Sequence, residues 1–224
     1  FRSQPASRTD MPRFLEKSRR FAISTNMKVM YSSLCAHDHL EEVSEAQFGR
    51  AILSRRMPHL LLTRDPKARL ISAFRDKFRN QPRVLGQPEF HGWQRIHQVH
   101  YKHLGLKETD SDEVKQARFL KMTFGEFVAL LPKTRLLDGH LRPQYLLQRL
   151  RFKRLIPVAP ARVTHVIPME GLDPSAALKQ WGIDVGERRN VTPKGGSEPF
   201  DDATADATIA RVYGRDYGLF YSQQ

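Results

Sequence analysis

Two short apolar runs, each followed by a polar turn and a helical pattern, constrain the fold of this chain most strongly. Residues 59–63, HLLLT, have the length and composition of a buried strand, and Asp65 and Pro66 follow as the N-cap and first residue of a helix. In that helix, PKARLISAFRDKF, apolar side chains recur at helical spacing. Residues 20–24, RFAIS, begin a similar unit with a turn at 25–28. This alternation predicts an α/β fold with a central, mostly parallel sheet flanked by helices.

The rest of the chain is expected to add mainly helices. The expected elements are a helical pattern over Met30–Leu40, a loop over Gln81–Gly92, a helix over Thr109–Met122, a helix begun by a Thr123/Glu126 capping box, a strand at His165–Ile167, and helices over Pro174–Trp181 and Thr204–Tyr213. We expect residues 1–19 to be a basic N-terminal extension and residues 20–224 to form a single domain.

The formal charge of +13 on 224 residues bears on partners rather than on fold. With 40% hydrophobic residues the chain can bury a substantial core, which argues against wholesale disorder. Residues 139–169 contain six Lys or Arg and no Asp or Glu. The sequence has no repeat, RG-rich tail or aromatic motif of the kind that RNA-binding surfaces carry. Two basic segments that converge on one small anionic molecule account for the charge equally well. We therefore expect no nucleic acid as partner.

Cysteine and apolar content narrow the class further. Cys35 is the single cysteine, which excludes an intramolecular disulfide framework and a thiolate zinc cluster. The apolar runs are far shorter than the ~20 residues that a transmembrane helix needs. We expect a soluble cytoplasmic enzyme, or a Golgi-lumenal one if an N-terminal anchor has been removed. The spacing of His91, His97, His100 and His103 suggests a metal site, but no supporting carboxylate is near, so a solvated helix face and no metal are predicted.

Both strand-to-helix turns carry residues suited to anions. In the first, NMKVMYSSL, Lys28 is followed by Ser32 and Ser33 where a helix should start. A lysine charge, hydroxyls and backbone N–H groups together can hold a terminal phosphate. The glycines of the Walker A pattern are absent, which argues against an ordinary P-loop kinase. In the second turn, Arg64 stands at the strand end and Ser72 on the helix.

The run RDPKARLISAFRDKF, residues 64–78, resembles the 3′-phosphate-binding motif of the carbohydrate sulfotransferases related to chondroitin 4-O-sulfotransferase, which reads close to RDPxxRLxSAFxxKF. NMKVMYSS is similar to the 5′-phosphosulfate loop of that family, roughly NPKVACSS, and departs from it at Met27, Met30 and Tyr31. The segments TFGEFVALL, GHLRPQ, VTHVIPMEGL and RVYGRDYGLFY resemble later elements of the family, so the resemblance covers nearly all of the chain after Arg19.

The resemblance implies a P-loop-like sulfotransferase fold and 3′-phosphoadenosine 5′-phosphosulfate (PAPS) as co-substrate, with no metal. Its sulfuryl group would pass to an acceptor hydroxyl by in-line displacement. By the same resemblance, Lys28 acts on the 5′-phosphosulfate and the leaving oxygen. The implied binding residues are Val29, Tyr31, Ser32 and Ser33 at the 5′-phosphate, and Arg64, Ser72 and Lys194 at the 3′-phosphate.

The acceptor hydroxyl must lose a proton, and imidazole is a suitable base near neutral pH. Of the nine histidines, His140 in the segment HLRPQ is the first choice. His39 and its neighbour His37, shortly after the Lys28 loop, are the alternatives, and Glu170 is a carboxylate option.

The acceptor is expected to be a carbohydrate or glycoconjugate. Lys67, Arg69 and the basic residues of 142–162 suggest an anionic saccharide, if they face it. Two other functions stay open at this point. One is a basic nucleic-acid-binding module, and the other is a degenerate sulfotransferase scaffold that binds the donor without transferring the sulfuryl group.

Overall fold

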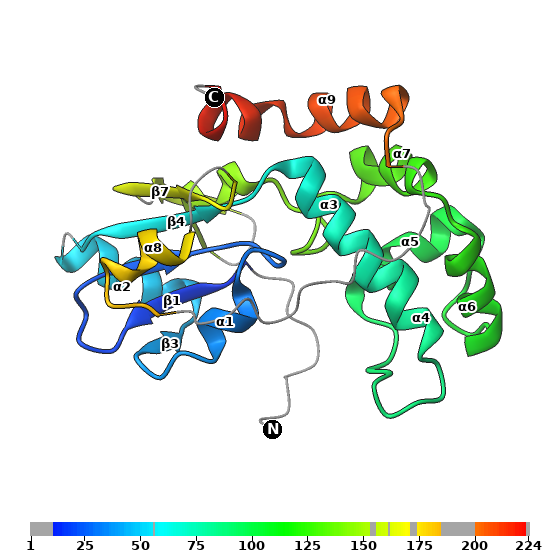
Figure 1. Ribbon diagram of the computed structural model, residues 1–224, viewed down its shortest axis with the longest axis horizontal. Helices are drawn as coiled ribbons and strands as arrows, with labels where there is room; N and C mark the ends of the chain where they lie inside the picture. Colours follow the sequence, from blue (N-terminus) through cyan, green and yellow to red (C-terminus); the bar gives the residue numbers. More distant parts are fainter. Residues whose placement is uncertain are drawn as a thin grey trace. The chain divides into compact units, whose positions relative to one another are not determined.

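The computed structural model describes residues 11–55, 57–152, 156–160, 162–170, 174–184 and 200–222 (Figure 1). The chain divides into two compact units. One, called the sheet unit here, includes the described residues of 11–66, 143–184 and 215–222. The other, the helical unit, includes residues 67–142 and 200–214. The single domain expected over residues 20–224 stays a prediction.

The sheet unit is built on five short strands. They are β1 (Arg13–Glu16), β2 (Ala22–Ser24), β3 (Leu40–Glu42), β4 (His59–Thr63) and β7 (His165–Pro168), and their order in the sheet is β3-β1-β2-β4-β7. Strands β2, β4 and β7 are parallel, with Ile23 level with Leu60 and Leu61 level with Val166. Strand β1 is antiparallel to both β2 and β3. The α/β class, with parallel strands at the centre of the sheet, is confirmed.

Strand β1 lies inside the range that the sequence assigned to an N-terminal extension. All four of its residues are buried, and Phe14 and Leu15 belong to different apolar clusters. Arg13 hydrogen-bonds the Ser24 hydroxyl and pairs with Glu45 at 3.1 Å. The charged ends of the strand therefore have partners inside the fold. The basic composition of the first twenty residues does not reveal this.

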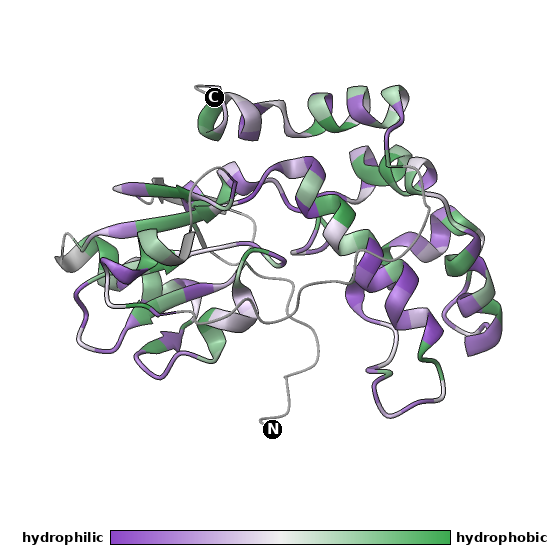
Figure 2. Ribbon diagram, in the orientation of Figure 1, coloured by the Kyte–Doolittle hydropathy of each residue, from purple (hydrophilic) through white to green (hydrophobic). Residues whose placement is uncertain are grey.

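Helices cover both faces of the sheet. They are α1 (Tyr31–Cys35), α2 (Glu45–Arg55), α8 (Pro174–Lys179) and the 3₁₀ helix η2 (Gln144–Gln148), and a hairpin of β5 (Arg149–Phe152) and β6 (Ile156–Pro160) joins them. Leu60 and Leu62 pack in one cluster with residues of α1 and α8, whereas Leu61 packs against η2. The middle of β4 is coloured hydrophobic in Figure 2. Because successive strand side chains point to opposite faces, the three leucines make β4 apolar on both.

The helical unit consists of consecutive helices around an aromatic core. Its elements are α3 (Pro66–Phe74), the π-helix η1 (Arg75–Asn80), α4 (Gln81–Arg83), α5 (Arg95–Leu104), α6 (Asp112–Lys121), α7 (Phe124–Thr134) and the first part of α9 (Ala203–Phe220). The capping box predicted for α7 is present, with Thr123 accepting from Glu126 N and the Glu126 carboxylate accepting from Thr123 N. Helix α9 is longer than predicted, with non-helical dihedrals at Tyr213.

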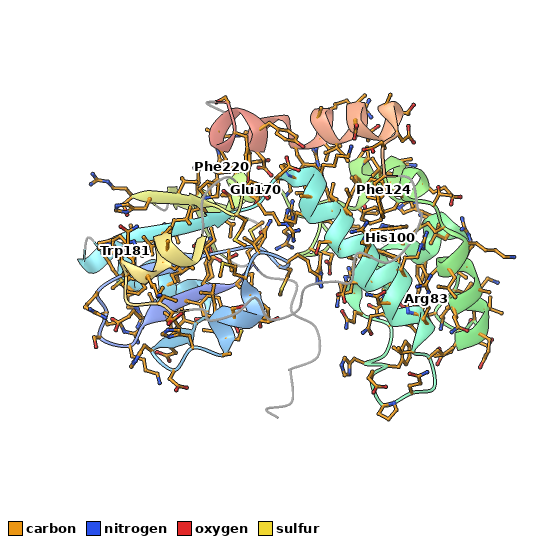
Figure 3. The ribbon with its side chains drawn as sticks, in the orientation of Figure 1. Arg83, His100, Phe124, Glu170, Trp181 and Phe220 are labelled. Atoms are coloured by element: carbon orange, nitrogen blue, oxygen red, sulfur yellow. The ribbon has the colours of Figure 1, made fainter. Side chains whose placement is uncertain are left out.

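The solvated helix face predicted for the histidine cluster is wrong at its centre. His97 and His100 on α5 are fully buried, with their rings edge-on to Phe78 at 5.3 and 5.2 Å between centroids. Figure 3 labels His100 within the helical unit. A ring nitrogen of each lies beside a backbone carbonyl, Nε2 of His97 at 2.8 Å from Lys77 O and Nδ1 of His100 at 2.7 Å from Ile96 O. Burial lowers the pKa of both histidines to about 4.

Within the described ranges, no group of three or more His, Cys, Asp or Glu side chains is placed to hold a metal ion. In the same part of the chain, no helix combines the length and the apolar character needed to cross a membrane.

The buried histidines predict a stability that falls with acidification. Their pKa is about 4 in the folded state and about 6.5 in the unfolded state, so the unfolded chain binds more protons between these values. The free energy of unfolding should therefore be fully developed above about pH 6.5. Below it, each histidine should remove up to about 1.4 kcal/mol per pH unit, down to about pH 4. Urea unfolding at several pH values measures this slope.

Replacing one buried histidine isolates its share. His100→Phe keeps an aromatic ring and should flatten the slope between about pH 6.5 and 4 by roughly 1.4 kcal/mol per pH unit. His91→Gln changes an exposed histidine and should leave the slope as it is. A His100→Phe slope equal to that of the parent protein would contradict the assignment.

Candidate functional site

The loop between β2 and α1 is a tight turn anchored from inside the sheet unit. The Thr25 hydroxyl donates to the Val29 carbonyl at 2.6 Å, and Val29 N donates to Asn26 O at 3.2 Å. Lys28 and Met30 have φ of 69° and 55°, the left-handed region that costs L-residues about 1–2 kcal/mol. The loop therefore makes its turn with positive φ angles but without the glycines of a Walker A loop.

The side chains of this loop divide into outward and inward groups. Lys28 and Ser33 are half-buried and Ser32 is exposed, so none of the three residues belongs to the core. Val29 is fully buried in the core, and the Tyr31 hydroxyl donates to Glu42 Oε2 at 3.1 Å. Of the five loop residues predicted to bind the donor, Val29 has only backbone groups to offer.

The structure brings Arg64 to the Lys28 loop. Its Nη1 donates to the Lys28 carbonyl oxygen at 3.1 Å, across 36 residues of sequence. The contact follows from topology, because β2 and β4 are parallel neighbours whose carboxyl ends meet at one edge of the sheet. The Gln144 side chain holds the Arg64 backbone, accepting from its N–H and donating to its carbonyl, both at 2.8 Å. The sequence motif RPQ drew attention to this segment, but nothing in it indicated that Gln144 would contact Arg64.

Glu170 lies just after β7, near the same edge (Figure 3). Burial raises its pKa, and this outweighs the hydrogen bond from the Asp65 backbone N–H, which acts to lower it. Glu170 Oε2 is buried without a hydrogen-bond partner among the described residues. Burial and the charges of Glu170 and Asp65 also raise the pKa of Tyr221. Glu170, offered as an alternative base from sequence, is therefore in the same unit as Lys28 and Arg64.

His140 belongs to the helical unit and forms a dyad with Asp138. Its Nδ1 lies 2.7 Å from Asp138 Oδ1, and its backbone N–H donates to the same oxygen at 2.8 Å. Burial acts to raise the pKa of Asp138, but the hydrogen bonds from His140 lower it overall, so the carboxyl is ionised. Because Nδ1 faces a carboxylate, it carries the proton, and Nε2 is the nitrogen suited to accept another.

Arg69 supports this dyad and does not face an acceptor. It is fully buried, its Nη1 donates to His140 O at 2.7 Å, and its guanidinium lies 5.5 Å from the centre of the Tyr213 ring. Lys67 pairs with Asp201 at 3.2 Å and with Asp206 at 2.9 Å. An acceptor-facing role for Arg69 is therefore wrong, since its side chain is fully buried. For Lys67, which is partly exposed, that role stays a prediction.

The remaining candidates lie elsewhere. Ser72 is half-buried on α3, in the helical unit and eight residues beyond Arg64 along the chain. Leu40 pairs with Glu16, and Lys17 N donates to His39 O at 2.9 Å, so His39 is at the amino ends of β2 and β4. That is the opposite edge of the sheet from Lys28. Lys194 lies outside the described residues.

Comparison with known proteins assigns the chain to a family. The family model of the sulfotransferase family matches residues 9–154, about two thirds of the chain, and this range includes Lys28, Arg64, Ser72 and His140. No curated protein matches the chain significantly, and no solved structure does. From the extent of the family match, the chain belongs to the sulfotransferase family.

Proposed function

We propose that the protein transfers a sulfuryl group from PAPS to a hydroxyl of a carbohydrate or glycoconjugate acceptor. The observation that carries this proposal is the hydrogen bond from Arg64 to the Lys28 carbonyl. It joins the two turns whose sequences resemble donor-binding motifs at one edge of the sheet, where α/β folds bind anionic ligands. The family match supports sulfuryl transfer in general, and the choice of PAPS and of a carbohydrate rests on the motif resemblance.

The residues at this edge fit a donor with phosphates at both ends of a nucleoside. The Lys28 charge, the Ser32 and Ser33 hydroxyls and the loop N–H groups, including those of Val29 and Tyr31, would hold the 5′-phosphosulfate. Arg64 would hold the 3′-phosphate at this edge. Ser72, which belongs to the helical unit, and Lys194, which lies outside the described residues, are assigned to the same phosphate from the sequence resemblance alone. Bound there, PAPS supplies the activated sulfuryl group. A lysine at the bridging oxygen stabilises the charge that develops on the leaving nucleotide.

The acceptor oxygen forms a bond to sulfur while the bond from sulfur to the bridging oxygen breaks, and the acceptor proton must go to a base. His140 is the proposed base, because it lies in the family-like segment GHLRPQ and Asp138 orients its ring through Nδ1. Glu170 is the second candidate, because its raised pKa makes its carboxylate a stronger base than usual. We do not keep His39 in the proposed site, since it lies at the opposite edge of the sheet from Lys28.

Donor binding can be tested by calorimetry with adenosine 3′,5′-bisphosphate. Arg64→Ala should weaken binding by about 10- to 100-fold, because a charged hydrogen bond to phosphate is worth roughly 1.5–3 kcal/mol. Adenosine 5′-phosphosulfate lacks the 3′-phosphate, so its affinity should change little in this variant. Lys17→Met removes an exposed lysine at the far edge of the sheet and serves as the matched control.

Arg64→Ala and the parent protein together separate the two rival functions. A nucleic-acid-binding module would bind duplex tightly with a steep salt dependence and would be indifferent to Arg64→Ala. A degenerate scaffold would bind the bisphosphate normally, yet the parent protein would transfer no label from radioactive PAPS to any of a panel of glycans, lipids and small hydroxylated metabolites.

The base is tested by turnover with an acceptor from that panel. His140→Ala should lower kcat by about 10²–10⁴-fold and leave nucleotide affinity near that of the parent protein, because the base acts on the acceptor proton. His39→Ala should leave kcat unchanged. A large loss in Glu170→Gln together with full activity in His140→Ala would assign the role to Glu170 instead.

A further inference from the structure

Gln144 hydrogen-bonds the backbone of Arg64 with both the oxygen and the nitrogen of its side-chain amide, at the carboxyl ends of β2 and β4, called the donor edge here. It is fully buried at the start of η2, with Oε1 accepting from Arg64 N and Nε2 donating to Arg64 O. Arg64 is the first residue after β4, at the carboxyl end of that strand. The two bonds therefore fix the backbone from which the guanidinium reaches the Lys28 carbonyl.

Asp216 on α9 holds Gln144 in turn. It is fully buried, and its two oxygens accept from consecutive backbone N–H groups, Gln144 N at 2.7 Å and Tyr145 N at 2.8 Å. These N–H groups open η2, where no preceding turn supplies a partner. The guanidinium of Arg215 also lies 4.6 Å from the centre of the Tyr145 ring. A buried carboxylate is costly unless hydrogen-bonded, so this geometry is strongly specified.

Neither residue has a part in the donor or base chemistry described above. Gln144 ends the segment GHLRPQ, and Asp216 lies in RVYGRDYGLFY. They are 72 residues apart in sequence and meet through a direct hydrogen bond within the sheet unit. Through Gln144, Asp216 is connected by hydrogen bonds to the backbone of Arg64.

We propose that Asp216 and Gln144 are positioning residues for recognition of the 3′-phosphate. Asp216 fixes the start of η2, and Gln144 fixes the N–H and C=O groups of Arg64. The guanidinium of Arg64 is thereby held beside the Lys28 loop. The C-terminal helix thereby becomes part of the donor-binding machinery without touching the nucleotide. This inference rests on the proposed function, because it assigns Arg64 to the 3′-phosphate.

The test measures two nucleotides against each variant by calorimetry. Gln144→Met keeps the length of the side chain and removes both hydrogen bonds, so affinity for adenosine 3′,5′-bisphosphate should fall about tenfold or more. Affinity for adenosine 5′-phosphosulfate should change less than threefold. The double variant Gln144→Met/Arg64→Ala should bind the bisphosphate no more weakly than Arg64→Ala, because both changes remove one interaction. Asp216→Asn retains one acceptor and should give a smaller loss with the same selectivity.

Thr164 offers a matched control at the other end of β4. Its hydroxyl accepts from His59 N at 2.9 Å and donates to His59 O at 3.2 Å. Like Gln144 at Arg64, it therefore hydrogen-bonds both backbone groups of a residue at the end of a strand. Thr164→Val removes that hold far from the donor edge and should leave both affinities unchanged, whatever it does to thermal stability. If Gln144→Met fails to fold, Gln144→Glu keeps the acceptor for Arg64 N, loses the donor to Arg64 O, and should show the same selective loss.

Three results would overturn the inference. Gln144→Met could lower the melting temperature while binding the bisphosphate as tightly as the parent protein, or it could weaken both nucleotides equally, as a merely structural residue would. Either result, with Arg64→Ala still selectively impaired, removes the positioning role and leaves the proposed function intact. Equal bisphosphate binding by the parent protein and Arg64→Ala would remove the proposed function together with this inference.

Discussion

The parallel pairing of β2 with β4 is the constraint on which the candidate donor site depends. It brings the carboxyl ends of both strands to one edge of the sheet, so that two turns far apart in sequence can share a ligand. The hydrogen bond from Arg64 to the Lys28 carbonyl joins these turns directly. Gln144 of η2 hydrogen-bonds the backbone of Arg64 at this edge, and Asp216 of α9 hydrogen-bonds the backbone of Gln144.

The parts of the fold that the sequence predicted well are those specified by neighbouring residues. Strand β4 has the predicted bounds, because a run of only five mostly apolar residues between polar turns has the length of a strand buried on both faces rather than of a helix. Helix α7 begins where its capping box predicts, because Thr123 and Glu126 satisfy each other's backbone N–H groups. The expected closeness of Lys28 and Arg64 needed one further step, the rule that parallel strands end at the same edge.

The parts that were missed depend on partners distant in sequence. The sequence predicted a basic extension where β1 lies, because the ion pair of Arg13 with Glu45 joins residues 32 positions apart. It predicted a surface position for His97, because the aromatic residues that surround this ring come from other helices. The turn at Lys28 reaches positive φ without glycine, which a motif search for glycines passes over. Gln144 carries no local signal of its role, because both groups that it binds belong to a residue 80 positions earlier.

A structure of the protein in complex with adenosine 3′,5′-bisphosphate tests the account most directly, since it locates both phosphates at once. The account predicts the 5′-phosphate at the Lys28 loop, within hydrogen-bonding distance of Ser32 or Ser33, and the 3′-phosphate on the Arg64 guanidinium. A nucleotide bound away from the carboxyl ends of β2 and β4, or bound with the two phosphates exchanged, would contradict it.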